Sequence, residues 1–195
     1  MNNLDKYFKD LSASKKEKLL KLEDVYKEVN QKINVVSRKD IDNIFEHHIL
    51  PALAISEVAE FENDSTVLDI GSGGGLPGIP LSIIFNKVNF TLVDSRKKKC
   101  EVMTEVVNKL KLRNVTVRQI RSNELKDQFD YVIGRAVAEP SEFMVLAAKN
   151  LKNINKEKSV FYISGGECKQ EIVKIAISDF FKEEYFKDKF IYVYP

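Results

Sequence analysis

The chain has 195 residues, of which 44% are hydrophobic and 31% are charged, and its net charge is only +2. This length suits one well-buried domain with a small appendage, and so small an excess of positive charge does not by itself indicate a nucleic-acid-binding protein. The two cysteines are too few and too far apart for a disulfide framework or a zinc site. The start lacks a signal-peptide pattern and no apolar run is long enough to span a membrane, so we expect a cytoplasmic protein.

The first 62 residues are expected to form a helical cap. Apolar residues recur there at steps of three and four, first over 11–33 and then over 41–55, with a kink at Pro51. The connection between the two stripes, 34–39, is short enough to hold basic side chains beside a ligand site.

The adjacent pair His47-His48 raises the question of a metal site. Neighbouring positions on a helix point about 100° apart, and no second pair of ligands accompanies the histidines. We therefore expect no metal, with one histidine packed and the other solvated.

From Thr66 onward, strand and helix patterns alternate, which is typical of a parallel sheet covered by helices on both faces. The pattern predicts a domain over 63–195 with seven strands and an antiparallel final pair, the count that distinguishes a methyltransferase sheet from a six-stranded Rossmann sheet. The expected strands are 66–70, 89–94, 115–119, 129–134 and 158–163, the expected helices are 77–85, 96–110, 140–151 and 167–178, and 180–194 is expected to close the sheet as a hairpin.

A glycine-rich loop joins the first strand to the next helix. Its glycines permit unusual φ angles and leave backbone N–H groups open to a ligand. The spacing Asp69-x-Gly71-x-Gly73-x-Gly75 matches the loop of S-adenosylmethionine (SAM) methyltransferases, whereas Gly73-x-Gly75-x-x-Gly78 matches the dinucleotide fingerprint. A carboxylate at the strand end would repel a pyrophosphate, but Asp69 can attract the ammonium group of a methionine moiety. The loop therefore favours SAM over a dinucleotide.

The second strand ends at Asp94, nineteen residues beyond Gly75, where a carboxylate can accept hydrogen bonds from both ribose hydroxyls of an adenosine. It can also cap the helix that follows. The first turn of that helix carries four cations, which oppose the helix dipole and suit an RNA backbone. The alternative for this run is a solvated helix face. The run consists of Arg96, Lys97, Lys98 and Lys99.

Ligands of open parallel sheets bind beyond the carboxyl ends of the strands. Ser122 and Asn123 follow the third strand, where short polar groups can meet the adenine edge. Arg135 ends the fourth strand and is our candidate catalytic or positioning residue; its alternative role is an ion pair with Glu139.

Several motifs together resemble the RsmG family, also called GidB or glucose-inhibited division protein B. They are Asn34-Val-Val-Ser37, His48-Ile-Leu50, the run from Leu68 to Leu81 with its Gly-Leu-Pro-Gly-Ile-Pro extension, Leu92-Val-Asp-Ser95 and Gly134-Arg-Ala136. The resemblance covers nearly the whole chain. It implies a Rossmann-like class I SAM methyltransferase that modifies ring nitrogen seven, N(7), of a guanine in small-subunit (16S) ribosomal RNA.

By the same resemblance, the family's cofactor contacts fall on Gly71, Leu76, Ser122, Asn123 and Arg135, with Asp94 at the ribose position. Two departures stand out. Pro51-Ala52 replaces a usual Asp-Ser, and Ile163-Ser-Gly-Gly166 replaces a usual Lys-Gly, which removes one expected cation near the substrate.

The residues alone leave three functions open. An RNA methyltransferase accounts for the glycine loop, Asp94 and the basic run, with RNA contacts from Arg38, Lys39 and residues 96–99. A small-molecule or protein methyltransferase accounts for the loop and Asp94, and a non-catalytic nucleotide-binding module accounts for the loop alone. The resemblance favours the first, with ribosomal RNA or a ribosomal particle as the substrate. We expect the protein to be a monomer.

Overall fold

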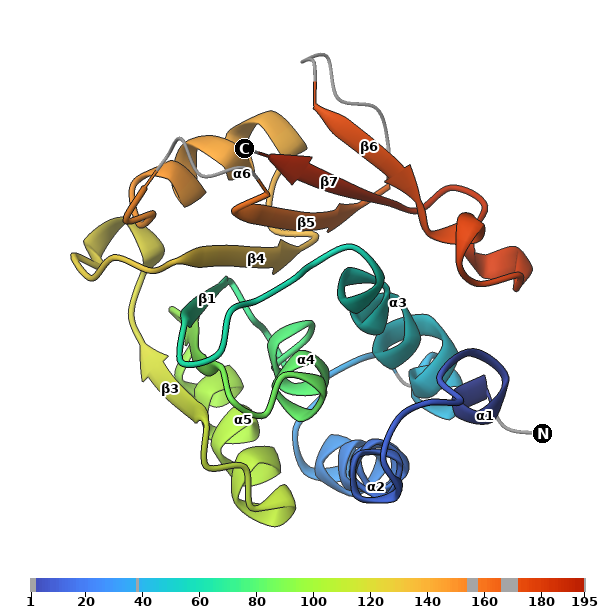
Figure 1. Cartoon of the computed structure of the whole chain (residues 1–195). Helices are drawn as coiled ribbons and strands as arrows, with labels where there is room; N and C mark the ends of the chain where they lie inside the picture. The colour runs from blue at the N-terminus through green and yellow to red at the C-terminus, as the bar shows by residue number, and fades with distance from the viewer. Residues whose placement is uncertain (1–2, 38, 154–157, 166–171, 195) are drawn as a thin grey trace.

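The computed structural model describes residues 3–37, 39–153, 158–165 and 172–194, and its centre is a seven-stranded sheet in the order β3-β2-β1-β4-β5-β7-β6 (Figure 1). Strands β1 to β5 pair in parallel, and β7 runs antiparallel to both β5 and β6. The predicted seven-stranded, mostly parallel sheet is confirmed. The strands are β1 (Thr66–Ile70), β2 (Asn89–Asp94), β3 (Val115–Gln119), β4 (Tyr131–Arg135), β5 (Val160–Ser164), β6 (Val173–Ala176) and β7 (Phe190–Tyr194).

In the described part of the chain, three α-helices precede the first strand, and three more lie between successive parallel strands. The helices are α1 (Asn3–Tyr7), α2 (Ala13–Lys32), α3 (Leu50–Leu53), α4 (Gly78–Ile84), α5 (Lys97–Leu110) and α6 (Pro140–Ala148). A single π-helical turn, Phe45–Ile49, leads into α3, so the helical stripe is interrupted just before Pro51. Short 3₁₀ turns cover Ile41–Asn43, Ala54–Glu57, Ser122–Glu124, Ile177–Asp179 and Glu184–Phe186.

The two faces of the sheet are buried by different helices. Successive residues of a strand point to opposite faces, and in β1 Val67 joins the apolar core on the side of α2, α4 and α5, whereas Leu68 joins a second core beneath α6 (Figure 1). Both side chains are completely buried, and burial of one such side chain stabilises the fold by roughly 1.5–3 kcal/mol. Burial on both faces explains why β1 and β4 are mostly apolar and are buried at four of their five positions.

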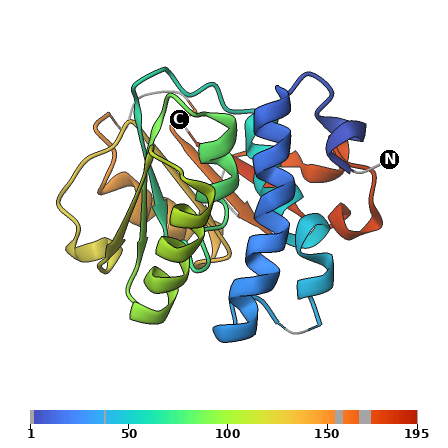
Figure 2. The ribbon, with the colours of Figure 1, turned by 90° about the horizontal axis from the view of Figure 1, so that it is seen from below.

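The N-terminal segment packs against the sheet domain. Helix α2 lies beside α4 and α5 (Figure 2), and the buried Leu22 belongs to the same apolar core as Phe61 and Phe90. The same N-terminal segment also contacts the C-terminal part of the chain, because the Tyr7 hydroxyl donates a hydrogen bond to Glu183 at 3.0 Å. The boundary near residue 62 stays a prediction, since the core is continuous across it.

Two expectations at the C-terminus are wrong. The helix expected over 167–178 begins in 167–171, which lie outside the described residues, but Val173–Ala176 forms strand β6. Apolar and polar residues alternate there, and Ile175 pairs with Ile191 of β7. The closing antiparallel pair is therefore β6 with β7. Within the first half of 180–194, only Glu184–Phe186 forms a short 3₁₀ turn, and its Phe186 is buried in the core.

Candidate active site

A cavity of about 460 Å³ opens beyond the carboxyl ends of β1 and β2, beside the segments that follow β3 and β4. Four of the predicted cofactor residues line it together, namely Gly71, Asp94, Ser122 and Asn123. Its size falls within the usual range for small-molecule sites. The other lining residues are Ile70, Val93, Ser95, Arg96, Ile120, Arg121, Ala136 and Val137.

Asp94 is the principal charge of this cavity. It is 5% exposed, and its carboxylate accepts hydrogen bonds from the backbone N–H of Gly73 at 3.1 Å and from that of Arg96 at 2.8 Å. The Arg96 guanidinium also donates to it at 3.2 Å. Although burial opposes ionisation, these donors hold the pKa of Asp94 below its usual range. Asp94 thus joins β2, the glycine loop and the start of α5 as an anion at the cavity wall.

The glycine loop requires glycine for two different reasons, a positive φ angle at Gly73 and a close approach at Gly78. Gly73 has a φ of +58°, and a Cβ at that position would meet only the carbonyl oxygen of Gly71, at 3.9 Å. At Gly78 a Cβ would lie 2.7 Å from the carboxylate of Asp69. The loop therefore leaves open space at Gly73 and closes tightly at Gly78, where α4 begins.

Asp69 lies beneath the loop and is completely buried. One carboxylate oxygen accepts a hydrogen bond from the Gly78 N–H at 2.9 Å, while the other has no hydrogen-bond partner among the described residues. Burial raises the pKa of Asp69 to about 7, against the lowering effect of the nearby Ser72 hydroxyl and of the Gly78 N–H. Its role toward a methionine ammonium stays a prediction, as do those of Gly75 and Leu76 in the same loop.

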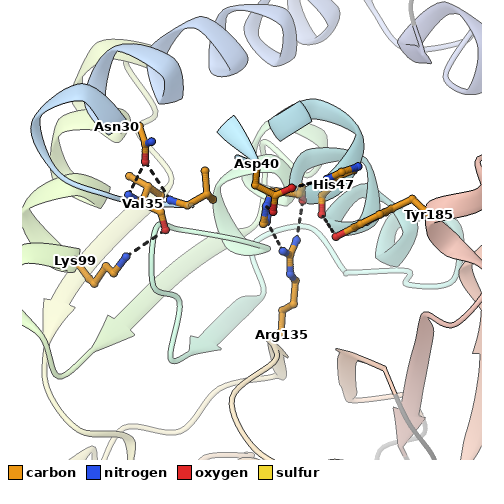
Figure 3. Close-up of polar contacts among 9 residues, drawn as sticks. Asn30, Val35, Asp40, His47, Lys99, Arg135 and Tyr185 are labelled. Carbon is orange, nitrogen blue, oxygen red and sulfur yellow. Dashed lines mark hydrogen bonds and ion pairs between the residues drawn. The ribbon is translucent and has the colours of Figure 1, made fainter. Parts of the chain in front are cut away.

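The N-terminal segment holds the outer side of the glycine loop. The buried hydroxyl of Tyr26, on α2, donates to the Gly74 carbonyl at 2.8 Å. Val35 packs so closely that a Cβ on Gly74 would collide with it. Asn30 accepts from the Val35 N–H at 2.6 Å, and Lys99 donates to the Val35 carbonyl at 3.2 Å (Figure 3). The loop is therefore fixed by residues that lie far from it in the sequence.

Arg135 does not line the cavity. Its guanidinium points toward the N-terminal segment, where it donates to the His48 carbonyl at 3.0 Å and contacts Nδ1 of the His48 ring (Figure 3). Burial lowers its pKa, but an arginine stays charged at neutral pH. The predicted catalytic residue thus lies at the end of β4 in a network with the π-helical turn, and π-helical turns occur often at functional sites.

Both histidines of the adjacent pair are bound to Asp40, so the expectation of one solvated histidine is wrong. His47 Nδ1 lies 2.5 Å from one Asp40 oxygen and His48 Nε2 lies 2.7 Å from the other. The π-helical turn changes the angle between neighbours, so both rings reach one carboxylate. His47 also stacks on Tyr185, with ring centroids 3.8 Å apart.

The basic run, Arg96 to Lys99, lies at the start of α5 beside the cavity of about 460 Å³, which we call the cofactor cavity. A second hollow, of about 560 Å³, is lined by Arg96 to Lys99 together with Lys32, and Arg96 also lines the cofactor cavity. Lys97 lies 3.8 Å from Glu101, and Lys98 is exposed. Lys39 is exposed outside this hollow, and Arg38 lies outside the described residues. The RNA contacts expected of Arg38, Lys39 and the basic run stay predictions.

Among the lining residues that sequence reasoning missed, Ala136 and Val137 come from the turn after β4. Ala136 has a φ of +50°, which turns the chain after β4 and places Val137 in the cavity wall. The Val137 N–H donates to the Tyr162 hydroxyl at 2.8 Å. No periodicity marks this turn, although its place after the fourth strand was a usable signal.

The residues present fit SAM. An anion at the end of β2 faces the cavity that can hold a ribose, the loop leaves space at Gly73, and a buried carboxylate oxygen of Asp69 lacks a partner beneath that loop. Among the residues that the structure describes, no group of three side chains is placed to hold a metal ion. Within the same residues, no helix is both long and apolar enough to cross a membrane.

The sheet order and the cavity beside a glycine loop define a class I SAM-dependent methyltransferase fold. Solved structures agree: the chain is similar to a SAM-dependent methyltransferase from Aquifex aeolicus (TM-score 0.55, 18% identity, 77% of this chain and 92% of that one). It is also similar to a mutant of MtNAS in complex with S-adenosylmethionine (TM-score 0.57, 13% identity, 93% of this chain and 71% of that one). Such low identities show the fold alone.

Sequence comparison specifies the family. The model for GidB, the rRNA small subunit methyltransferase G, matches residues 15–190. Proteins named ribosomal RNA small subunit methyltransferase G from Phocaeicola vulgatus and Christiangramia forsetii are each 41% identical, over 94% and 98% of this chain and 93% and 95% of theirs. The chain belongs to this family of methyltransferases.

Proposed function

We propose that this protein transfers the methyl group of SAM to N(7) of a guanine in 16S ribosomal RNA. The match of residues 15–190 to the rRNA small subunit methyltransferase G family carries the proposal. The cavity beside the glycine loop supports it, because four residues expected to bind the cofactor meet there.

Different residues of the site are expected to bind different parts of SAM. Asp94 accepts hydrogen bonds from the ribose hydroxyls. The Arg96 side chain now donates to the Asp94 carboxylate, so it must share that carboxylate with the ribose or move away from it. Ser122 and Asn123 line the same cavity and meet the adenine edge. The loop from Gly71 to Leu76 receives the methionyl part, with the carboxylate of Asp69 beneath it. Charge-assisted hydrogen bonds of this kind are roughly twice as strong as neutral ones.

The chemistry requires orientation more than proton transfer. When bound, SAM supplies a methyl group activated by the positive charge on its sulfur. Ring nitrogen seven of guanine carries an in-plane lone pair and no proton, so the protein needs no general base. Its contribution is to align the two reactants and stabilise the moving charge. Arg135, fixed at the end of β4 by His48 and outside the cavity lining, is the proposed positioning residue.

RNA is the substrate that the charges favour. Arg96 lies at the border between the cofactor cavity and the hollow formed with Lys97, Lys98 and Lys99. Cations there can contact phosphates next to the target base. Lys39 and Arg38 are further RNA contacts expected from the sequence, and of these two Arg38 lies outside the described residues. We expect a monomer in the cytoplasm, acting on naked 16S RNA or on a small-subunit particle.

The test is incubation of the protein with labelled SAM and 16S RNA from a strain that lacks the enzyme, followed by nucleoside analysis. The expected product is a single labelled 7-methylguanosine per RNA. Label in another nucleoside would contradict the proposed position. Label confined to a small molecule or a protein would support the alternative methyltransferase, and SAM binding without any transfer would support a binding module.

A further inference from the structure

A larger hollow, of about 860 Å³, lies at the edge of the sheet opposite the cofactor cavity. Asn89, at the start of β2, lines this hollow, and Asp94, at the end of β2, lines the cofactor cavity. The six residues of β2 separate the two sites by about 20 Å. We call the hollow the basic groove, and its charged residues are the cations Lys15, Lys18, Lys21, Lys87, Lys109, Lys111 and Arg113 with the acids Glu17 and Asp64.

Most of these cations lack an acidic partner. Lys109 pairs with Glu28 at 2.9 Å, but the other six make no ion pair with any residue in the described ranges. At the cofactor cavity, by contrast, Arg96 is bound to Asp94 and Lys97 faces Glu101. A group of unpaired like charges opposes the compact state. The basic groove therefore has a charge that the fold does not need and that a polyanion would neutralise.

A series of hollows that share lining residues follows α5 between the two sites. Arg96 lines both the cofactor cavity and the hollow of the basic run. Lys97 lines that hollow and the next one, along the outer face of α5, and Lys109 lines the latter and the basic groove. The acids on this path are already engaged, since Glu101 faces Lys97 and Glu105 pairs with Lys32. The 14 residues of α5 span about 21 Å, which matches the distance of about 20 Å between the two sites.

We propose that the basic groove binds the sugar-phosphate backbone of the RNA substrate at a distance from the target guanine, so that the RNA runs along α5 from the cofactor cavity to the opposite edge of the sheet. This inference rests on the proposed function. An RNA held at the cofactor cavity is favoured over an acidic protein for one reason. Hollows that share lining residues follow α5 from that cavity to the basic groove, and cations lie at both ends of this path.

The experiment compares RNA binding by the wild type and by a triple variant, Lys18→Gln/Lys21→Gln/Arg113→Gln. A matched control, Lys126→Gln/Lys149→Gln/Lys158→Gln, removes three exposed cations that do not line the groove. The logarithm of the association constant for naked 16S RNA is measured against the logarithm of salt concentration. Each lost phosphate contact lowers the slope by about 0.7–0.9, so the slope of the groove variant should be less steep by about 2–3 and that of the control unchanged.

Two further measurements separate the outcomes. The groove variant should keep wild-type SAM affinity and raise KM for 16S RNA while leaving kcat nearly unchanged; equal slopes in the groove variant and the wild type would overturn the inference. Weakened binding to an assembled small subunit, with naked RNA unaffected, would mean that the groove meets a ribosomal protein, and the inference would again be wrong. A wild type that methylates no RNA would instead reject the proposed function, and that result is independent of the comparison of slopes.

Discussion

Arg135 at the end of β4 and His48 in the π-helical turn are joined twice, through the His48 carbonyl and through Nδ1 of its ring. A guanidinium only donates hydrogen bonds, so Nδ1 must be the unprotonated acceptor. The ring proton therefore resides on Nε2 and is donated to Asp40 at 2.7 Å. This pairing requires a neutral His48 between a cation and an anion.

Replacing Arg135 should harm both activity and stability. Arg135→Ala leaves the buried groups of His48 without their donor, and loss of one partner in such a contact costs about 1–3 kcal/mol. Arg135→Lys keeps the charge but loses the paired donors. We expect methyl transfer to fall strongly in both variants, and the melting temperature to fall more in the alanine variant. If both variants kept wild-type turnover, Arg135 would have no positioning role.

His48 should make the folded state sensitive to acid. Burial, followed by the positive charge of Arg135, lowers the pKa of His48 to about 4 from its ordinary value of 6.5. Between these values the unfolded chain binds more protons, so the free energy of unfolding falls as pH decreases from about 6.5 toward 4, by up to about 3 kcal/mol. His48→Asn should lose this dependence, as denaturant unfolding at several pH values will show. An identical pH profile in the variant would contradict the assignment.

Asp69 should act in the opposite direction. Burial raises its pKa to about 7 from 3.8, so the folded state binds more protons between these values and loses stability as pH rises through that range. Asp69→Asn can still accept the hydrogen bond of Gly78 but carries no charge. The variant should therefore be stabilised relative to the wild type more at pH 8 than at pH 5. A difference that does not change with pH would show that Asp69 is not the group responsible.

Asp94 should matter for the cofactor. Asp94→Ala removes the carboxylate from the cavity wall and should weaken SAM binding by about 1–3 kcal/mol. The control is Asp130→Ala, because Asp130 accepts from Thr66 at the opposite end of the strands, at 2.8 Å. The control variant should lose stability while its SAM affinity, measured by calorimetric titration, stays the same. Equal SAM affinities in all three proteins would remove Asp94 from the cofactor site.

The sequence by itself determined the parallel strands and the end of the strands at which the cavity opens. The pattern of apolar residues along a strand reflects which side chains are buried, and it can be recognised locally. From this pattern the expected bounds of β1, β2 and β3 agree with those in the structure. Because the carboxyl ends of parallel strands meet at one edge, Asp94 and Ser122 had to lie near the glycine loop.

Only the tertiary structure decided what surrounds that cavity. The bonds from Arg135 to His48 and from Tyr26 to Gly74 join residues 87 and 48 positions apart. No local pattern encodes such contacts, because they depend on how the N-terminal helices pack against the finished sheet. The same holds for β6, whose short alternating stretch becomes a strand by pairing with β7. The basic groove likewise arises because the start of α2 and the end of α5 meet, which brings together cations that are scattered along the sequence.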